Sequence, residues 1–250
     1  MKKTIRITAA TIAAFLAISA SAQLSNNITA IYGNGNNSNG WSTASNGTLQ
    51  LALRAKDRTT GATPWSVGNV YTFAIGTAPG SPTKALWNWD FSITTTPDTV
   101  HTPSVFVGVY RLSFDTDPTA ADNWHTVNPI TYWGDNSFGY GDTAAGAGVE
   151  PPLPTSDYTV VQNSQNIMFS YFGGDPNVAG TYDFRLDAYQ GVDALGHLGS
   201  PIASTTIRVI VGDGGTGFAP VPEPSTYGII GAVALVGIVL IRRRKQAASA

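Results

Sequence analysis

The chain has 250 residues, of which only 12% are charged and none is cysteine, while 27 are glycine. An average soluble protein has about a quarter of its residues charged, so this composition is atypical of a cytosolic enzyme. The lack of cysteine excludes disulfide scaffolds, zinc–thiolate sites, iron–sulfur clusters and thiol nucleophiles. An apolar content of 42% is too high for intrinsic disorder.

The charges are unevenly distributed along the chain. Half of the 14 basic residues lie at the two ends, whereas Gln23 to Pro222 holds 7 basic and 15 acidic residues, a net charge of −8. Nucleic acid is not expected as a partner of such an acidic domain, because phosphate backbones bind to basic surfaces. The basic ends therefore have a separate role.

The N-terminal segment has the organisation of an export signal. Three basic residues open it, an apolar run follows from Ile7 to Ile18, and it ends in Ala20-Ser21-Ala22. This order is typical of a secretory signal peptide. We expect residues 1–22 to direct export through the Sec machinery and to be removed by signal peptidase after Ala22.

Residues 23–211 are expected to form one domain made of strands. Several segments alternate apolar and polar residues with a period of two, which is the pattern of half-buried strands. The clearest are Leu49–Arg54, Trp87–Ile93, Tyr182–Ala188 and Ile207–Val211. Shorter candidates are 70–75 and 167–172, and Val105–Phe114, apolar on both faces, is predicted to be a central strand.

Seven to nine such strands predict an all-β fold, an antiparallel β-sandwich of the Ig-like or jelly-roll kind. The segment Gly180–Leu186 resembles a late strand of bacterial Ig-like modules, which implies that Tyr182 is a corner tyrosine bonded to the backbone. Asp115–Ser156 is predicted to be a long loop-like excursion. Residues 212–220 are predicted to be a Gly-rich stalk.

Two groups of oxygen-bearing side chains in Gly-rich loops are candidate calcium ligands. The first group is Asp115, Asp117 and Asp122, and the second is Asp135, Asn136 and Asp142. Calcium takes six to eight hard oxygen ligands and can stiffen the loops of exported proteins. The alternative is that these residues only form turns, through bonds between side chain and backbone.

The aromatic residues divide into two groups. Trp87 and Trp89 lie on the apolar face of a predicted strand and are expected in the core. Trp124, Trp133 and Tyr140 lie in the excursion and are candidates for stacking on a glycan. The alternative is that they anchor a long loop onto the sandwich.

No residue is predicted to be catalytic. Before Pro222 the domain has a single glutamate, Glu150, and its histidines, His101, His125 and His197, are far apart in the sequence. A glycosidase needs a pair of carboxylates, and a serine hydrolase of the common type needs a G-x-S-x-G turn. We therefore expect a protein that is not an enzyme, and a secreted hydrolase is the least supported alternative.

The C-terminal segment 221–245 has three parts in a fixed order. The Pro222-Glu223-Pro224-Ser225 motif is followed by an apolar run at 227–241 and by the basic cluster Arg242, Arg243, Arg244 and Lys245. As a transmembrane helix the run would span only about 22 Å, short of the ~30 Å hydrocarbon core. Such a weak anchor would keep the arginines cytoplasmic and the acidic domain outside.

These three parts together resemble the PEP-CTERM sorting signal of exported proteins in Gram-negative bacteria that make extracellular polysaccharide. The resemblance implies that an exosortase recognises Pro222–Pro224, removes the tail and transfers the protein outward; the alternative is a plain membrane anchor. The segments Trp133–Gly139 and Val161–Gln165 are similar to parts of ectodomains that precede such tails. The implied function is a non-catalytic structural protein of the cell surface or matrix, associated with exopolysaccharide. A carbohydrate-binding module is the alternative.

Overall fold

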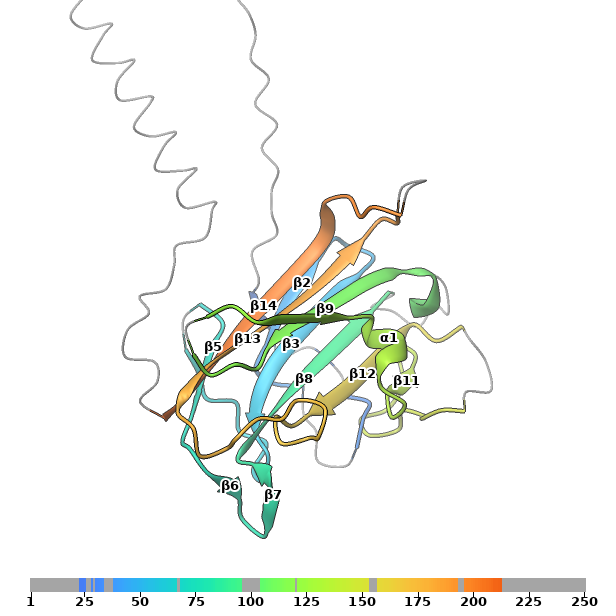
Figure 1. The fold of residues 1–250 in the computed structure, drawn as a ribbon. Helices are drawn as coiled ribbons and strands as arrows, with labels where there is room; N and C mark the ends of the chain where they lie inside the picture. Colours follow the sequence, from blue (N-terminus) through green and yellow to red (C-terminus); the bar gives the residue numbers. More distant parts are fainter. Residues whose placement is uncertain are drawn as a thin grey trace, which may run out of the picture.

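The computed structural model describes residues 23–25, 28, 30–33, 38–66, 68–95, 104–119, 121–152, 157–192 and 196–212. The predicted signal peptide, the sorting signal and the stalk beyond Gly212 lie outside these residues. Within them the chain forms two six-stranded sheets that pack face to face, together with a small hairpin (Figure 1). The prediction of an all-β sandwich is confirmed.

The first sheet, called sheet A, is antiparallel throughout. Its strands are, in spatial order, β1 (Gln23–Ser25), β2 (Trp41–Ser45), β3 (Gln50–Asp57), β8 (Trp87–Thr94), β12 (Val160–Gln165) and β11 (Ser137–Gly139). All eight residues of β8 are buried. This strand is therefore covered on both faces, whereas its alternating sequence predicted one exposed face.

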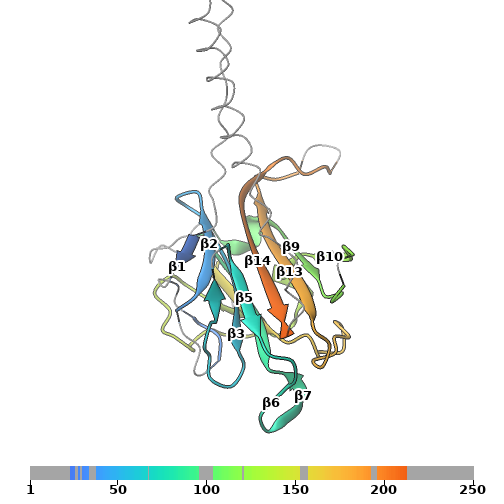
Figure 2. The ribbon, with the colours of Figure 1, turned by 90° about the vertical axis from the view of Figure 1, so that its left-hand side faces the viewer.

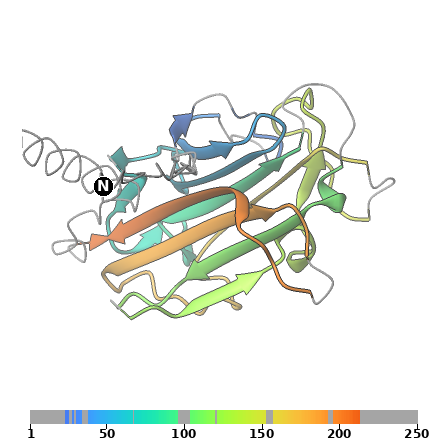
Figure 3. The same cartoon turned by 90° about the horizontal axis from the view of Figure 1, so that it is seen from above.

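The second sheet, called sheet B, is antiparallel except where β14 and β5 run parallel. Its order is β10 (Trp124–Val127), β9 (Val109–Asp115), β13 (Gly180–Tyr189), β14 (Pro201–Val211), β5 (Val70–Phe73) and β4 (Trp65–Ser66). Figure 3 shows β14, β13, β9 and β10 side by side, from orange to yellow-green. The hairpin of β6 (Thr77–Ala78) and β7 (Ser81–Ala85) extends from one end of the sandwich (Figure 2).

Large aromatic side chains fill the space between the sheets. Trp89 on β8 lies with its ring centroid 4.6 Å from that of Phe184 on β13, and Trp87 lies 5.4 Å from Tyr182. Trp87 and Trp89 are at most 1% exposed, as predicted. The hydroxyl-to-backbone bond expected of Tyr182 is made instead by Tyr71, which donates to the carbonyl of Gly40 at 2.6 Å.

The segment 167–172 is not a strand, and the strand predicted at Val105–Phe114 is confirmed only from Val109. Val105–Val107 is a 3₁₀ helix, because the Ser104 side chain accepts a hydrogen bond from the Phe106 N–H and so caps a helical turn in place of an extended start. The strand β9 begins only at Val109 and lies next to the edge strand β10, so it is not central. The segment 167–172 forms turns, because the Asn166 side chain accepts from the Met168 N–H directly after β12.

The excursion Asp115–Ser156 is more ordered than predicted. It contains β10, β11 and the short helix α1 (Pro129–Tyr132), which is capped by the Asn128 side chain. Asn136 is fully buried, and its amide donates to the carbonyls of Pro129 and Ile130 at 2.8 and 3.0 Å. These bonds fix the excursion internally, and Nδ2 of Asn163 on β12, which donates to Oδ1 of Asn136 at 2.9 Å, fastens it to the sandwich.

Candidate functional site

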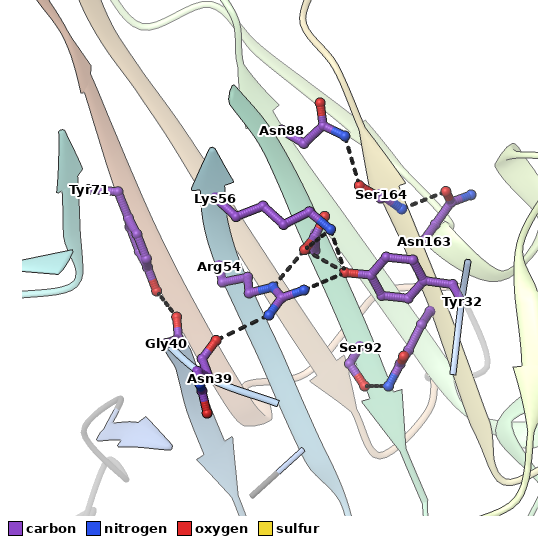
Figure 4. Close-up of polar contacts among 12 residues, drawn as sticks. Tyr32, Asn39, Gly40, Arg54, Lys56, Tyr71, Asn88, Ser92, Asn163 and Ser164 are labelled. Atoms are coloured by element: carbon purple, nitrogen blue, oxygen red, sulfur yellow. Dashed lines mark hydrogen bonds and ion pairs between the residues drawn. The ribbon is translucent and has the colours of Figure 1, made fainter. Parts of the chain in front are cut away.

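The densest group of charged side chains lies on the outer face of sheet A (Figure 4). Leu51, Leu53 and Ala55 of β3 point into the core, so the alternate residues Arg54 and Lys56 point to the opposite face. Arg54 pairs in register with Asp90 of β8, which points the same way between two core aromatics.

A single carboxylate oxygen joins this group, which we call the Asp90 cluster (Tyr32, Arg54, Lys56 and Asp90). Oδ2 of Asp90 lies 2.6 Å from Nε of Arg54 and 3.3 Å from Nζ of Lys56. The Tyr32 hydroxyl donates to the same oxygen at 2.5 Å and accepts from Nη2 of Arg54 at 2.8 Å. The cluster thus closes a ring of charge-assisted hydrogen bonds.

The Asp90 cluster is sealed from solvent. Arg54 and Asp90 are 0% exposed, and the guanidinium of Arg54 lies 4.3 Å from the centroid of the Trp41 ring. Ile28, Ala30 and Tyr32 form an apolar cover over this face, in one buried cluster with Trp41 of β2 and Ala52 of β3. The covering segment around Tyr32 is therefore held to the sheet by the buried charges beneath it and by its own apolar contacts.

The backbone of Ile31 binds the covering segment both to sheet A and to the excursion. The N–H of Ile31 donates to Oε1 of Gln162 at 2.7 Å, and the carbonyl of Ile31 accepts from the N–H of Gly148 at 2.6 Å. A Cβ at position 148 would lie 2.6 Å from that carbonyl oxygen, so this close approach requires glycine. The segment is clamped between sheet A and the excursion.

Burial and charge act against each other in the Asp90 cluster. Burial alone would raise the pKa of the Asp90 carboxyl, but Arg54 and Lys56 outweigh it and hold that pKa below its ordinary value. For Lys56 burial dominates, so its pKa is lowered. Burial and the neighbouring carboxylate raise the pKa of the Tyr32 hydroxyl, which therefore remains a donor to Asp90.

Amide side chains continue this network toward β12. Nδ2 of Asn88 donates to Oγ of Ser164 at 3.0 Å, and Nε2 of Gln162 donates to Oγ of Ser92 at 3.0 Å (Figure 4). Nδ2 of Asn163 donates to Oδ1 of Asn136 at 2.9 Å. Gln162 and Ser164 thus extend the buried polar layer of the outer face, whereas Asn163, paired in register with the core residue Phe91, contacts the excursion from the core side.

Sequence reasoning missed the Asp90 cluster. The available signal was the placement of Arg54 and Lys56 at alternate positions of one apolar strand, with Asp90 inside another. Opposite charges at such positions can pair only if the two strands are neighbours, and these positions are 36 residues apart in the chain. The segment that covers them, around Tyr32, lies within the predicted domain, but nothing in its sequence indicated that it packs over these charges.

The structure uses several of the candidate calcium ligands to form turns. Oδ1 of Asp115 accepts from the N–H of Asp117 at 3.0 Å, and its Oδ2 accepts from the N–H of Asn123 at 3.0 Å. Asp122 and Asp142 are exposed, as is Asp135, whereas Asn136 is buried. Over the described ranges, no group of three or more His, Cys, Asp or Glu side chains could hold a metal ion.

The three candidate glycan-stacking residues do not form one surface. Trp133 is 6% exposed and packs on the core side of sheet A, 5.6 Å from the ring of Phe91. Tyr140 is half-buried and its hydroxyl donates to Asp157 at 3.0 Å. Trp124 alone of the three is substantially exposed, at 43%, and it lines a groove on sheet B.

The remaining candidates lie apart from one another. Glu150 and His197 are exposed, and so is His125, whose ring stacks on Phe114 at 5.9 Å. His101 lies outside the described residues, as do Pro222–Ser225 and the basic cluster Arg242–Lys245. In the part of the chain that the structure describes, no helix is long and apolar enough to cross a membrane. The expected span 227–241 is not among those residues.

The fold and the C-terminal segment define a class of protein: a β-sandwich domain that precedes a sorting signal. The PEP-CTERM protein-sorting motif matches residues 220–245. The chain is therefore a PEP-CTERM protein, a cell-surface protein sorted by an exosortase from a membrane-anchored precursor. No curated protein and no solved structure shows significant similarity to it.

Proposed function

We propose that this protein is a non-catalytic structural component of the cell surface or extracellular matrix, associated with exopolysaccharide. The observation that carries the proposal is the sealed Asp90 cluster. Arg54, Lys56 and Asp90 bind to one another and to Tyr32 beneath an apolar cover, so these charges fasten the fold and face no substrate. A buried polar network whose charges bind one another holds the fold in one rigid conformation, as expected of a structural domain.

The route to the surface follows from the two ends of the chain. In this proposal the Sec machinery exports the chain, signal peptidase removes residues 1–22, and the span 227–241 holds a single-pass precursor in the inner membrane. The exosortase then acts at Pro222–Pro224. Residues 212–220 separate the sandwich from the membrane before that step.

The acidic surface fits a location outside the membrane. From Gln23 to Pro222 the net charge is −8, which disfavours adsorption to the anionic lipids of the inner membrane and favours a soluble, hydrated domain. The same charge disfavours association with an acidic polysaccharide. Association with a neutral one would come from hydrogen bonding and aromatic stacking.

Cell fractionation tests this function. In cells with an active exosortase we expect the sandwich, detected by antibody, in the surface and polysaccharide-bound fractions, and in cells without the exosortase in the inner membrane. The variant Glu223→Ala should reproduce the inner-membrane result in cells with the enzyme. In cells that make no exopolysaccharide, we expect release of the protein into the medium.

An unchanged distribution between cells with and without polysaccharide would contradict the structural role. So would the release of reducing sugar ends from that polysaccharide by the purified protein, which would support the hydrolase alternative.

A further inference from the structure

A groove of about 390 Å³ lies on the outer face of sheet B, opposite the face that packs in the core. Trp124 on the edge strand β10 forms one side, and the turn of Gly68 and Asn69 before β5 forms the other. The floor is made by β13 and β14, which lie between them (Figure 2). The groove thus crosses the sheet from one edge strand toward the other edge.

The main residues of the groove lie in one row of residues that are paired across neighbouring strands of sheet B. Trp124 pairs with Asp115, and Asp115 pairs with Asp183. Asp183 pairs in turn with Arg208, and Arg208 pairs with Val70. Residues paired across strands place their side chains on the same face. The indole ring, the ion pair and the opposite wall are therefore fixed by the register of five strands and not by a loop.

The ion pair of this row is rigid and remains accessible. Nε and Nη2 of Arg208 donate to Oδ1 and Oδ2 of Asp183 at 2.7 and 2.6 Å, in a two-bond fork. The Arg208 and Asp183 side chains are 31% and 23% exposed. A ligand in the groove would meet a carboxylate and a guanidinium already held in position.

Asn69 adds an amide whose hydrogen bonds are not used within the described part of the chain. It is 9% exposed, and with φ at 60° it is the one non-glycine residue of positive φ among the described residues. Its backbone carbonyl accepts from the Arg208 N–H at 3.0 Å, so strand pairing holds this unusual conformation. Asparagine adopts positive φ in turns more readily than most residues do, so the turn presents a fixed amide at the edge of the groove.

We propose that this groove binds an uncharged polysaccharide, with one pyranose ring stacked on Trp124. Hydroxyl groups of the sugar bond to Asn69 and to the Asp183–Arg208 pair. An exposed indole presents a flat apolar face with polar groups beside it, which suits the mixed apolar and hydroxyl surface of a sugar. This inference rests on the proposed association with exopolysaccharide and names the site for it.

The charges of the groove favour a neutral chain over an acidic one. Arg208 is matched by Asp183, and the neighbouring Arg185 lies 2.8 Å from Asp187, so each guanidinium already has a carboxylate. The negative charge of the whole domain repels a polyanion at long range. A neutral chain meets neither this repulsion nor the cost of displacing an ion pair.

Titration of the full-length chain tests the proposal, by calorimetry with cellohexaose, maltohexaose, laminarihexaose, mannohexaose and hexagalacturonate. We expect binding of at least one uncharged hexasaccharide, a loss of tenfold or more in affinity for Trp124→Ala, and a smaller loss for Asn69→Gly, which keeps the positive φ accessible. Tyr132→Ala is the matched control: Tyr132 is 48% exposed on α1, outside the groove, and its loss should leave affinity unchanged.

Three results would overturn the groove as a site for neutral sugars: no binding of any uncharged hexasaccharide at millimolar concentration, binding of hexagalacturonate alone, or equal affinity of Trp124→Ala and the unmodified chain. The urea midpoint of each variant shows that it is folded. If the groove fails these tests while the protein still follows the polysaccharide in cells, the proposed function stands and another surface carries it.

Discussion

The variant Asp90→Asn is expected to lower the free energy of unfolding by about 3–5 kcal/mol, the usual cost of removing one partner of a buried ion pair. Asparagine keeps the shape of the side chain but leaves Arg54 and Lys56 without their carboxylate. Both cations lie beneath the apolar cover, where water cannot take the place of the lost carboxylate. Urea denaturation of the full-length chain, followed by tryptophan fluorescence, measures the loss.

Asp183→Asn is the matched control for this prediction. It removes the carboxylate of a second Arg–Asp pair between neighbouring strands, but both side chains of that pair reach solvent. Exposed pairs contribute about 0–1 kcal/mol, so the control should cost no more than that. Equal losses in the two variants would show that burial of the Asp90 cluster has no energetic effect.

The pH dependence of the same variant gives a second readout. The pKa of Asp90 is lowered in the folded protein, whereas an unfolded aspartate titrates near about 3.9. The stabilisation from Asp90 is therefore present above that pH and is lost as pH falls through the folded pKa. The difference between the unmodified chain and Asp90→Asn should shrink below about pH 4, and a constant difference down to strong acid would contradict the ion pair.

Trp89→Ala is expected to cost about 3–5 kcal/mol, the range for truncation of a large aromatic in a packed core. The ring of Trp89 is fully buried and lies within 4.6 to 6.2 Å of four other rings, those of Phe114, Trp133, Phe172 and Phe184. Trp89 belongs to sheet A, and the four rings around it come from sheet B, from the excursion and from the turn after β12. Removal of the indole therefore leaves a cavity where four parts of the fold meet.

Trp124→Ala makes the same chemical change at a half-exposed position. We expect its free energy of unfolding to change by about 0.5 kcal/mol or less, since no core cavity forms. Urea denaturation measures both variants, and a loss of similar size in both would contradict the assignment of Trp89 as the centre of the core.

The strands that the sequence predicted correctly are those that alternate without interruption. β13 places Tyr182, Phe184 and Leu186 on one buried face, as the period of two requires. Val105–Phe114 is richer in apolar residues, but the cap made by Ser104 is a local hydrogen bond that periodicity does not detect. Apolar pattern therefore did not locate the start of this strand, and it did not predict that Phe106 and Val107 of the helical turn are exposed.

The candidate sites were harder to predict, because they depend on contacts between distant parts of the chain. Trp124 and Trp133 are nine positions apart in one predicted loop-like excursion, and nothing in the sequence distinguished their exposure. Only the packing of Trp133 against Trp89 and Phe91 removes it from the surface. Likewise Asn69 and Trp124 become two sides of one groove only through the order of strands in sheet B.

The mass of the mature C-terminus tests the central claim most directly, namely that an exosortase sorts this protein. The protein is purified from the surface fraction of its own cells, with and without the exosortase, and intact mass spectrometry locates the last residue. We expect the protein from cells with the exosortase to lack residues Arg242–Ala250, and the protein from cells without the enzyme to retain them. An intact C-terminus at Ala250 on surface-located protein would contradict the account.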